Sequence, residues 1–278
     1  MVMAQIETPD IGTLVTTEID VDGILRLTLN DPDTRNSLSE AMLNALAVAL
    51  DAAAKNSSVR VIVLAAAGPV FCAGHNLKEM TAARTSSKNE GDGGRAYFTK
   101  ILHQCSAVMQ SIPNHPKPII AEVGGIATAA GCQLAASCDL ALAAHGTKFA
   151  TPGVHIGLFC STPMVALSRS VGQKHAMEML LTGDFVDADR AAEIGLINYA
   201  VSPEELTAET MKLAQKIASK SSATIAFGKP AFYAQAEKSL SDAYDYAAAV
   251  MVENMLAHDA EEGIAAFIEK RPANWLDK

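Results

Sequence analysis

Two short segments of this sequence combine a glycine-containing turn with the start of a helical pattern, and chemistry is expected there. They are residues 70–80, VFCAGHNLKEM, and residues 123–134, VGGIATAAGCQL. Backbone N–H groups at such turns have no intrahelical acceptor, and small side chains let a ligand approach the backbone closely. Two such donors that converge on one oxygen would form an oxyanion hole at a helix N-terminus, which suits enolates and tetrahedral intermediates.

The elements that must position these turns begin with strands. Residues 13–19 and 24–29 alternate apolar and polar side chains around the turn DVDG, which is typical of a β-hairpin. Apolar runs predict three buried strands, each followed by a glycine-containing turn and a helical stretch: residues 59–64, 118–123 and 140–143. This alternation indicates an α/β fold with short connections.

Helix signals follow the hairpin. Ser37 and Glu40 have the spacing of a capping box, which predicts a helix up to about Lys55. Residues 83–95, ARTSSKNEGDGGR, are small and charged and predict a mobile loop.

The C-terminal quarter of the sequence has a helical composition. Ser202, followed by proline and then by glutamate at the third position, predicts a helix N-terminus, and the pattern stays helical to about Ile268. We therefore expect an α/β core over residues 1–200 and a helical region over residues 201–278. Its alanine-rich helices would leave apolar surface that favours oligomerisation.

Composition narrows the class of protein. The 278 residues are 49% hydrophobic and carry a net charge of -9, with no basic run longer than two, which argues against nucleic-acid and membrane partners. The first twelve residues lack the charged-then-apolar order of a signal peptide, so a cytoplasmic location is expected. Five cysteines without CxxC spacing predict reduced core thiols and no metal site: Cys72, Cys105, Cys132, Cys138 and Cys160.

Both chemical segments resemble motifs of the enoyl-CoA hydratase/isomerase (crotonase) family, namely F-x-A-G-x-D-[LI]-x-E-M and V-N-G-x-A-x-G-G-G-C-E-L-A-x-x-C-D. The likeness extends over nearly the whole chain, through residues 35–38, 149–152, 178–183, 192–197 and 261–271. It implies a crotonase-type spiral of β-β-α units whose C-terminal helices drive homo-trimers or dimers of trimers. It also implies an acyl-CoA substrate from fatty acid metabolism, with coenzyme A as part of the substrate and no separate cofactor.

The resemblance assigns site residues as well. The oxyanion-hole amides fall on His75 and on Ala130, where the family usually has glycine. Lys270 is expected to reach the nucleotide bound by a neighbouring subunit. The coenzyme A adenine is expected near two segments, represented by Arg35, Asn36, Ser37 and Leu38 and by Ala73, Gly74, His75 and Leu77.

The chain departs from the family at both catalytic glutamates of a hydratase. These correspond to Gln133 and Gly153, which are twenty positions apart, as the two family glutamates are. Glutamine cannot exchange a proton at neutral pH, and each lost acid or base typically removes about 10²–10⁴ in rate. Efficient hydration is therefore not expected, and glutamate at both positions is predicted to raise hydration well above wild type if the pocket geometry is intact.

Other side chains could replace the missing carboxylates. His75 is the most attractive, since imidazole titrates near neutrality; the alternative is that its ring packs against coenzyme A or solvent. Other polar residues are expected to be structural: His155 buried and hydrogen-bonded, His103 solvated or hydrogen-bonded, and Asp139 hydrogen-bonded. Glu79 is expected to face solvent and Cys132 to pack in the core. Glu122 has no predicted position.

Two functions remain open. One is an enzyme that takes acyl-CoA through an enolate, as a hydratase-like lyase or isomerase, a hydrolase or a decarboxylase. The other is an acyl-CoA-binding protein that lacks efficient catalysis, which the absence of both glutamates motivates.

Overall fold

The computed structural model describes residues 13–86 and 91–278 and contains two sheets. The larger sheet has six strands, of which β1 and β2 form the predicted antiparallel hairpin and all other neighbours are parallel. Its strands, in spatial order, are β1 (Val15–Ile19), β2 (Ile24–Leu29), β3 (Val61–Ala66), β5 (Ile119–Val123), β7 (Leu140–Ala144) and β10 (Tyr199–Val201).

The smaller sheet makes the chain a spiral. Its strands, in spatial order, are β4 (Val70–Cys72), β6 (Ile126–Thr128), β8 (Lys148–Ala150) and β9 (Val186–Asp187). β3, β5 and β7 of the large sheet are each followed at once by β4, β6 and β8 of the small sheet, and helices complete each unit. The predicted crotonase-type arrangement of β-β-α units is thus confirmed.

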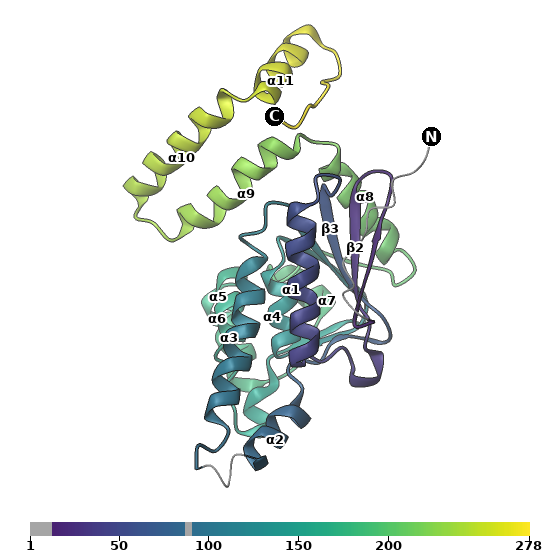
Figure 1. The fold of residues 1–278 in the computed structure, drawn as a ribbon, viewed down its shortest axis with the longest axis vertical. Coiled ribbons are helices and arrows are strands. Elements are labelled where there is room, and N and C mark those ends of the chain that lie inside the picture. Colours follow the sequence, from purple (N-terminus) through teal and green to yellow (C-terminus); the bar gives the residue numbers. More distant parts are fainter. Residues whose placement is uncertain (1–12, 87–90) are drawn as a thin grey trace.

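Helices cover both faces of the large sheet (Figure 1). Side chains alternate along β3, so Ile62 and Leu64 join the main core with α1 (Glu40–Lys55), whereas Val61 and Val63 pack with α8 (Leu206–Ala218). α8 therefore belongs with the sheet, although it follows residue 200. The other helices before α8 are α2 (Leu77–Ser86), α3 (Arg95–Ser111), α4 (Ala130–Ser137), α5 (Pro163–Ser170), α6 (Gln173–Thr182) and α7 (Ala188–Glu193), with short 3-10 helices at Pro32–Thr34 and Pro152–Ile156.

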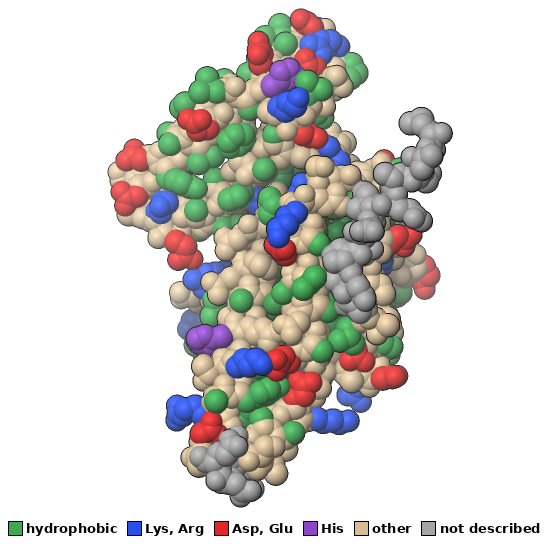
Figure 2. Space-filling model, in the orientation of Figure 1, with side chains coloured by type: hydrophobic (Ala, Val, Ile, Leu, Met, Phe, Trp, Pro, Cys, Tyr) green, Lys and Arg blue, Asp and Glu red, His purple; other side chains and the backbone are tan. Residues whose placement is uncertain are grey.

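Three helices form an arm that extends from this core: α9 (Ser222–Ala236), α10 (Leu240–Met255) and α11 (His258–Glu269). Figure 2 shows hydrophobic side chains gathered over the arm. Its exposed residues include Phe232, Leu240, Tyr244, Leu256 and Phe267. Within the described part of the chain, no helix combines the length and the apolar character needed to cross a bilayer.

A buried ion pair attaches the arm to the core. The Lys229 ammonium group of α9 lies 2.7 Å from a carboxylate oxygen of Asp139 and donates to the carbonyls of Ile112 and Lys117. The Tyr233 hydroxyl donates to the other Asp139 oxygen at 2.9 Å. Asp139 therefore has the structural hydrogen-bonding role predicted for it.

Two predicted helix starts are wrong because nearby hydroxyls have other partners. α1 is capped by Ser39, whose Oγ accepts the Met42 N–H at 3.1 Å, while the Ser37 hydroxyl donates to Thr34. α8 begins at Leu206, since residues 203–205 form a turn after Ser202.

The predicted loop at residues 83–95 is also partly wrong. Residues 83–86 complete α2 and Arg95 starts α3, whereas residues 87–90 lie outside the described part. The first twelve residues, on which the signal-peptide expectation rests, lie outside it as well.

Helix α4 starts from a strained backbone. Ala129, its N-cap, has φ 52° and ψ -119°, a conformation that glycine adopts far more readily than alanine. The Ala129 N–H donates to the Ala150 carbonyl at 2.9 Å, which fixes the turn. A Cβ added to Gly131 would lie 2.0 Å from the Cys72 carbonyl oxygen, so only glycine lets α4 approach β4 this closely.

Replacing Ala129 with glycine is expected to stabilise the protein. Relief of the left-handed strain outweighs the added chain entropy and leaves a net gain of about 1 kcal/mol in the free energy of unfolding. Denaturant unfolding measures it, with Ala127→Gly in β6 as the matched control, which should destabilise. Equal loss of stability in both variants would contradict the strain argument.

Replacing Lys229 with methionine is expected to lower the free energy of unfolding by about 3–5 kcal/mol, because it leaves the buried Asp139 carboxylate without its cation. Lys55→Met removes an ion pair whose two side chains are both exposed, and should change stability by no more than about 0.5 kcal/mol. A similar small effect of both substitutions in denaturant unfolding would show that the arm does not depend on the buried pair.

Candidate functional site

The two glycine-containing turns meet at the N-terminus of α4. Gly74 has φ 88°, and the position of a Cβ on it lies 3.2 Å from the Ala130 nitrogen and 3.0 Å from the Ala129 Cβ. The Thr128 hydroxyl donates to the Ala73 carbonyl at 3.2 Å and links the turns directly. The sequence-predicted pair, His75 and Ala130, is thus brought together from segments more than fifty residues apart.

Both amides of this pair are available to a ligand. Among the described residues, neither the His75 N–H nor the Ala130 N–H has a protein acceptor, and Ala130 is the first residue of α4. The helix dipole adds a partial positive charge at this end. Two donors beside a helix N-terminus can stabilise an oxygen that gains negative charge, such as the oxygen of an enolate.

Gln133 lies one turn after Ala130 on α4. Its side chain is buried, and within the described structure its Oε1 atom has no hydrogen-bond partner. An orphaned buried acceptor of this kind is costly unless a ligand or water pairs with it. The carboxamide can therefore orient a polar group but cannot transfer a proton.

Gly153, predicted to stand where the family has its second glutamate, has no room for a side chain. A Cβ there would lie 2.7 Å from the Leu158 carbonyl oxygen and 2.9 Å from the Cys160 sulfur. The Leu158 N–H also donates to the Gly153 carbonyl at 2.9 Å, so this turn is closed by its own backbone. The prediction that glutamate at positions 133 and 153 raises hydration required an intact pocket, and the structure does not meet this condition at position 153, because a side chain there would displace main chain.

Both ring nitrogens of His75 are buried, which favours the neutral form of the ring. Burial lowers its pKa, and the nearby Leu38 carbonyl and Glu79 carboxylate only partly offset that effect. Neither ring nitrogen reaches a partner in the described residues with hydrogen-bond geometry. A neutral imidazole has one donor and one acceptor nitrogen, so it can accept a proton or donate one.

The other histidines near the site are structural or solvated. His155 Nε2 donates to the Thr182 carbonyl at 2.7 Å, which confirms the hydrogen bond, but the residue is exposed where a buried one was predicted. It lies outside the core because the 3-10 helix that carries it runs along the surface. His103 is exposed on α3, as predicted.

Glu79 does not face solvent as predicted. Its Oε2 atom accepts the Glu40 N–H at 3.2 Å and the Tyr97 hydroxyl at 3.1 Å, so it satisfies the N-terminus of α1. Burial, with the Glu79 carboxylate, raises the pKa of Tyr97 to about 12. This half-buried carboxylate is thus engaged in holding α1, α2 and α3 together.

Glu122, which had no predicted position, is structural. Its carboxylate pairs with both terminal nitrogens of Arg26, at 2.5 and 3.0 Å, and accepts the Thr207 hydroxyl at 3.0 Å. It joins β5 to β2 and α8.

The five cysteines are buried free thiols, as predicted. Burial raises the pKa of Cys132 to about 12, so this thiol stays protonated at neutral pH and cannot act as a ready nucleophile. The described residues contain no group of three or more histidine, cysteine or acidic side chains arranged to hold a metal ion.

The segments predicted to surround the adenine lie side by side. The Ala73 N–H donates to the Arg35 carbonyl at 3.1 Å, and the Leu38 N–H donates to the Gly74 carbonyl at 2.8 Å. Asn36, Ser37 and Leu38 are buried, and the Asn36 amide donates to two core carbonyls. Of residues 35–38, only Arg35 presents an exposed side chain to a ligand.

The remaining predicted residues lie at opposite ends of the molecule. Leu77 begins α2, whereas Lys270 follows α11, and Figure 1 places these two helices far apart. Lys270 is exposed at the end of α11, far from the start of α2, so within its own subunit it does not reach the turn at His75.

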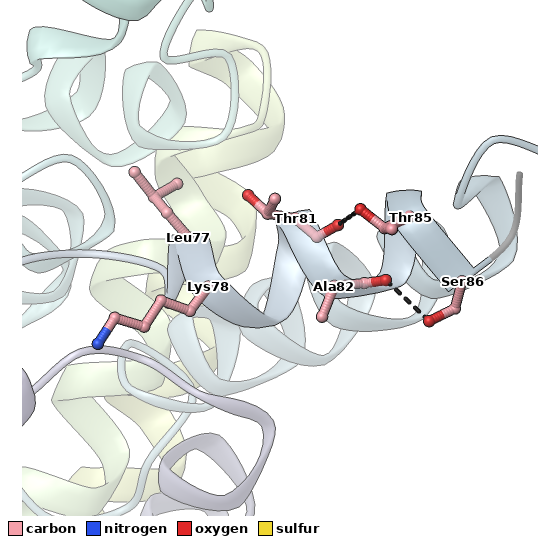
Figure 3. A pocket seen from close by; sticks show the side chains of 6 residues that line it. All are labelled: Leu77, Lys78, Thr81, Ala82, Thr85 and Ser86. Carbon is pink, nitrogen blue, oxygen red and sulfur yellow. Dashed lines mark hydrogen bonds between the residues drawn. The ribbon is translucent and has the colours of Figure 1, made fainter.

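A hollow of about 640 Å³ runs along α2, beginning directly after the turn (Figure 3). The Thr85 and Ser86 hydroxyls donate to carbonyls one turn earlier, which leaves their carbon atoms to line the space. Sequence reasoning found Leu77 but missed the others, although their three- and four-residue spacing was a usable signal. The lining residues are Leu77, Lys78, Thr81, Ala82, Thr85 and Ser86.

Comparisons with known proteins agree on one family. The family model for enoyl-CoA hydratase/isomerase matches residues 20–278. Mouse (Mus musculus) enoyl-CoA hydratase domain-containing protein 3, mitochondrial, is 48% identical over 91% of this chain and 82% of its own length. The pattern of residues 149–163, together with residues 127–134, resembles the same branch of the family, and the comparison confirms this resemblance.

Solved structures give the same result. The crystal structure of enoyl-CoA hydratase from Mycobacterium smegmatis has a TM-score of 0.89 and 48% identity, covering 95% of this chain and 99% of that one. The human enoyl-CoA hydratase domain-containing protein 3 structure has a TM-score of 0.88 and 45% identity, covering 94% and 100%.

The comparisons also correct one expectation. A cytoplasmic location was expected from the sequence, but the mouse, rat and human relatives are mitochondrial by name, which contradicts it. The fold, the two turns and the match over residues 20–278 together show that this chain belongs to the enoyl-CoA hydratase/isomerase family.

Proposed function

We propose that this protein binds an acyl-CoA thioester whose carbonyl oxygen accepts hydrogen bonds from the amides of His75 and Ala130. The observation that carries the proposal is the meeting, at the N-terminus of α4, of two N–H groups that have no acceptor in residues 13–86 and 91–278. These donors are part of the backbone, so the substitutions that changed the side chains of the family motif leave them in place.

The rest of the ligand has room on either side of the turn. Arg35 offers an exposed cation for the nucleotide, and Gly74, Ala73 and Leu77 offer the adjoining backbone and apolar contacts. The acyl chain would occupy the hollow along α2.

We also propose that the chain forms a homo-trimer or a dimer of trimers through the helical C-terminal region, residues 201–278. The exposed apolar residues of the arm support this, because such surface on a soluble protein usually meets a partner. In such an assembly Lys270 would complete the coenzyme A site of a neighbouring subunit.

The chemistry we propose is enolate formation rather than efficient hydration. When a base removes the α-proton, the electron pair moves onto the thioester oxygen, where the two amides stabilise it. The His75 ring is our candidate for the base, because it belongs to the same residue as one of the two amides and its neutral form can accept a proton. Gln133 orients the acyl group or a water molecule by hydrogen bonding.

A second function, acyl-CoA binding without turnover, is favoured by one specific observation. The space beside Gly153 is closed by the Leu158 carbonyl and the Cys160 sulfur, so a glutamate at this position would collide with its neighbours.

Both functions are tested with crotonyl-CoA and a longer 2-enoyl-CoA. We expect micromolar-range binding by calorimetry, and loss of enone absorbance at least about 10²-fold slower than in a relative with both glutamates, because acid–base catalysis by two groups is missing. Residual turnover that His75→Ala abolishes would assign an enzyme, and binding without turnover would assign the second function. Hydration as fast as the reference, or no binding at all, would contradict the proposal.

A further inference from the structure

The residues that follow α11 turn back onto the junction between core and arm. Lys270 adopts φ 57°, which ends α11 and reverses the chain. Residues 271–278 then run beside the turn that joins α8 to α9 and beside the start of α11 (Figure 1).

Arg60, just before β3 in the core, holds this junction. Its Nε donates to the Ala218 carbonyl and one terminal nitrogen donates to the Lys220 carbonyl, each at 2.8 Å. The other terminal nitrogen lies 2.6 Å from a carboxylate oxygen of Asp277. One guanidinium therefore ties the end of α8, the following turn and the C-terminal segment to the same strand.

Two carboxylates extend the connection into the arm. Asp277 also accepts the N–H of Ser222, the first residue of α9, at 2.7 Å. Asp259 is 1% exposed and accepts the N–H groups of Leu276 and Asp277, each at 2.9 Å. Hydrogen bonds to ionised groups are among the stronger ones in proteins.

Side-chain packing completes the contact. The Trp275 indole N–H donates to the Ser219 carbonyl at 3.1 Å, and its ring lies against Gly263 of α11, where an added Cβ would be 3.1 Å away. Arg271 pairs with Glu262 through two hydrogen bonds, at 2.6 and 2.9 Å.

We infer that residues 271–278, which we call the clasp, fix the orientation of the α9–α11 arm on the core through the ion pair between Arg60 and Asp277. The contacts of the clasp join the start of β3, the α8–α9 turn and α11 at one point. The ion pair between Lys229 and Asp139, in contrast, attaches the arm only through α9. Loss of the Arg60–Asp277 ion pair would free the end of the arm that contains α11, while α9 stays attached to the core. This inference does not depend on the ligand of the site.

The test is hydrogen–deuterium exchange on the full-length protein carrying Asp277→Asn or Arg60→Gln. The matched control is Arg169→Gln, which breaks another core–arm pair, with Glu237, whose side chains are 60% and 67% exposed. Asp277→Asn keeps the shape of the side chain and removes its charge. It therefore still tests the role of the ion pair if Arg60→Gln disturbs β3.

We expect both clasp variants to speed exchange in α11 and at the start of α9 by about tenfold, since a charge-assisted contact is lost, with α1 and the control unchanged. Wild-type protection of α11 in Asp277→Asn would overturn the inference. Equal acceleration in Arg169→Gln, or acceleration spread equally over α1, would overturn it too.

Discussion

The close approach of α4 to the end of β4 is the constraint on which the site depends. Gly131 allows it, because any Cβ there would overlap the Cys72 carbonyl, and the strained Ala129 turns the chain into the helix. This approach places the Ala130 N–H beside the turn at Gly74, and neither the Ala130 nor the His75 amide has an acceptor among the residues that the structure describes. The spiral of β-β-α units serves the same contact, since it brings two turns from distant parts of the sequence to one edge of the small sheet.

The features that could be predicted from the sequence are those that depend on residues close together along the chain. The hairpin, the buried strands and the long helices follow from the spacing of apolar side chains, and the two turns follow from their small residues and their likeness to family motifs. The placement of His75 beside Ala130 could be expected for the same reason. The residues that cap the helices could not be predicted. Ser37 and Ser202 have the spacing of N-caps, but their hydroxyls donate to Thr34 and Glu205 and do not cap a helix.

What escaped prediction depends on contacts between distant residues. The sequence shows that Gly153 lacks a carboxylate, but only the fold shows that Leu158 and Cys160 fill the space. Glu79 looks like a solvent-facing helix residue until Tyr97 and the start of α1 are placed beside it. The side-chain partners of Asp139 and Glu122 lie more than eighty residues away along the chain, so no local sequence pattern predicts them.

The two hydrogen-bond donors of the proposed site belong to the backbone, whereas proton transfer requires side chains. Its fold provides two amide donors that do not depend on the side chains of His75 and Ala130, while the positions that the sequence resemblance aligns with the two family glutamates hold Gln133 and Gly153. Function on a shared fold is set by such local changes. The proposed recognition of a thioester carbonyl therefore depends on backbone amides, whatever reaction follows it.

The most direct measurement compares the affinities of butyryl-CoA and S-butyl-CoA, a thioether that lacks only the carbonyl oxygen. Two hydrogen bonds to that oxygen predict that the thioester binds between about fivefold and a hundredfold more tightly. Equal affinities would show that the amides of His75 and Ala130 do not bind the carbonyl, and would contradict the central claim.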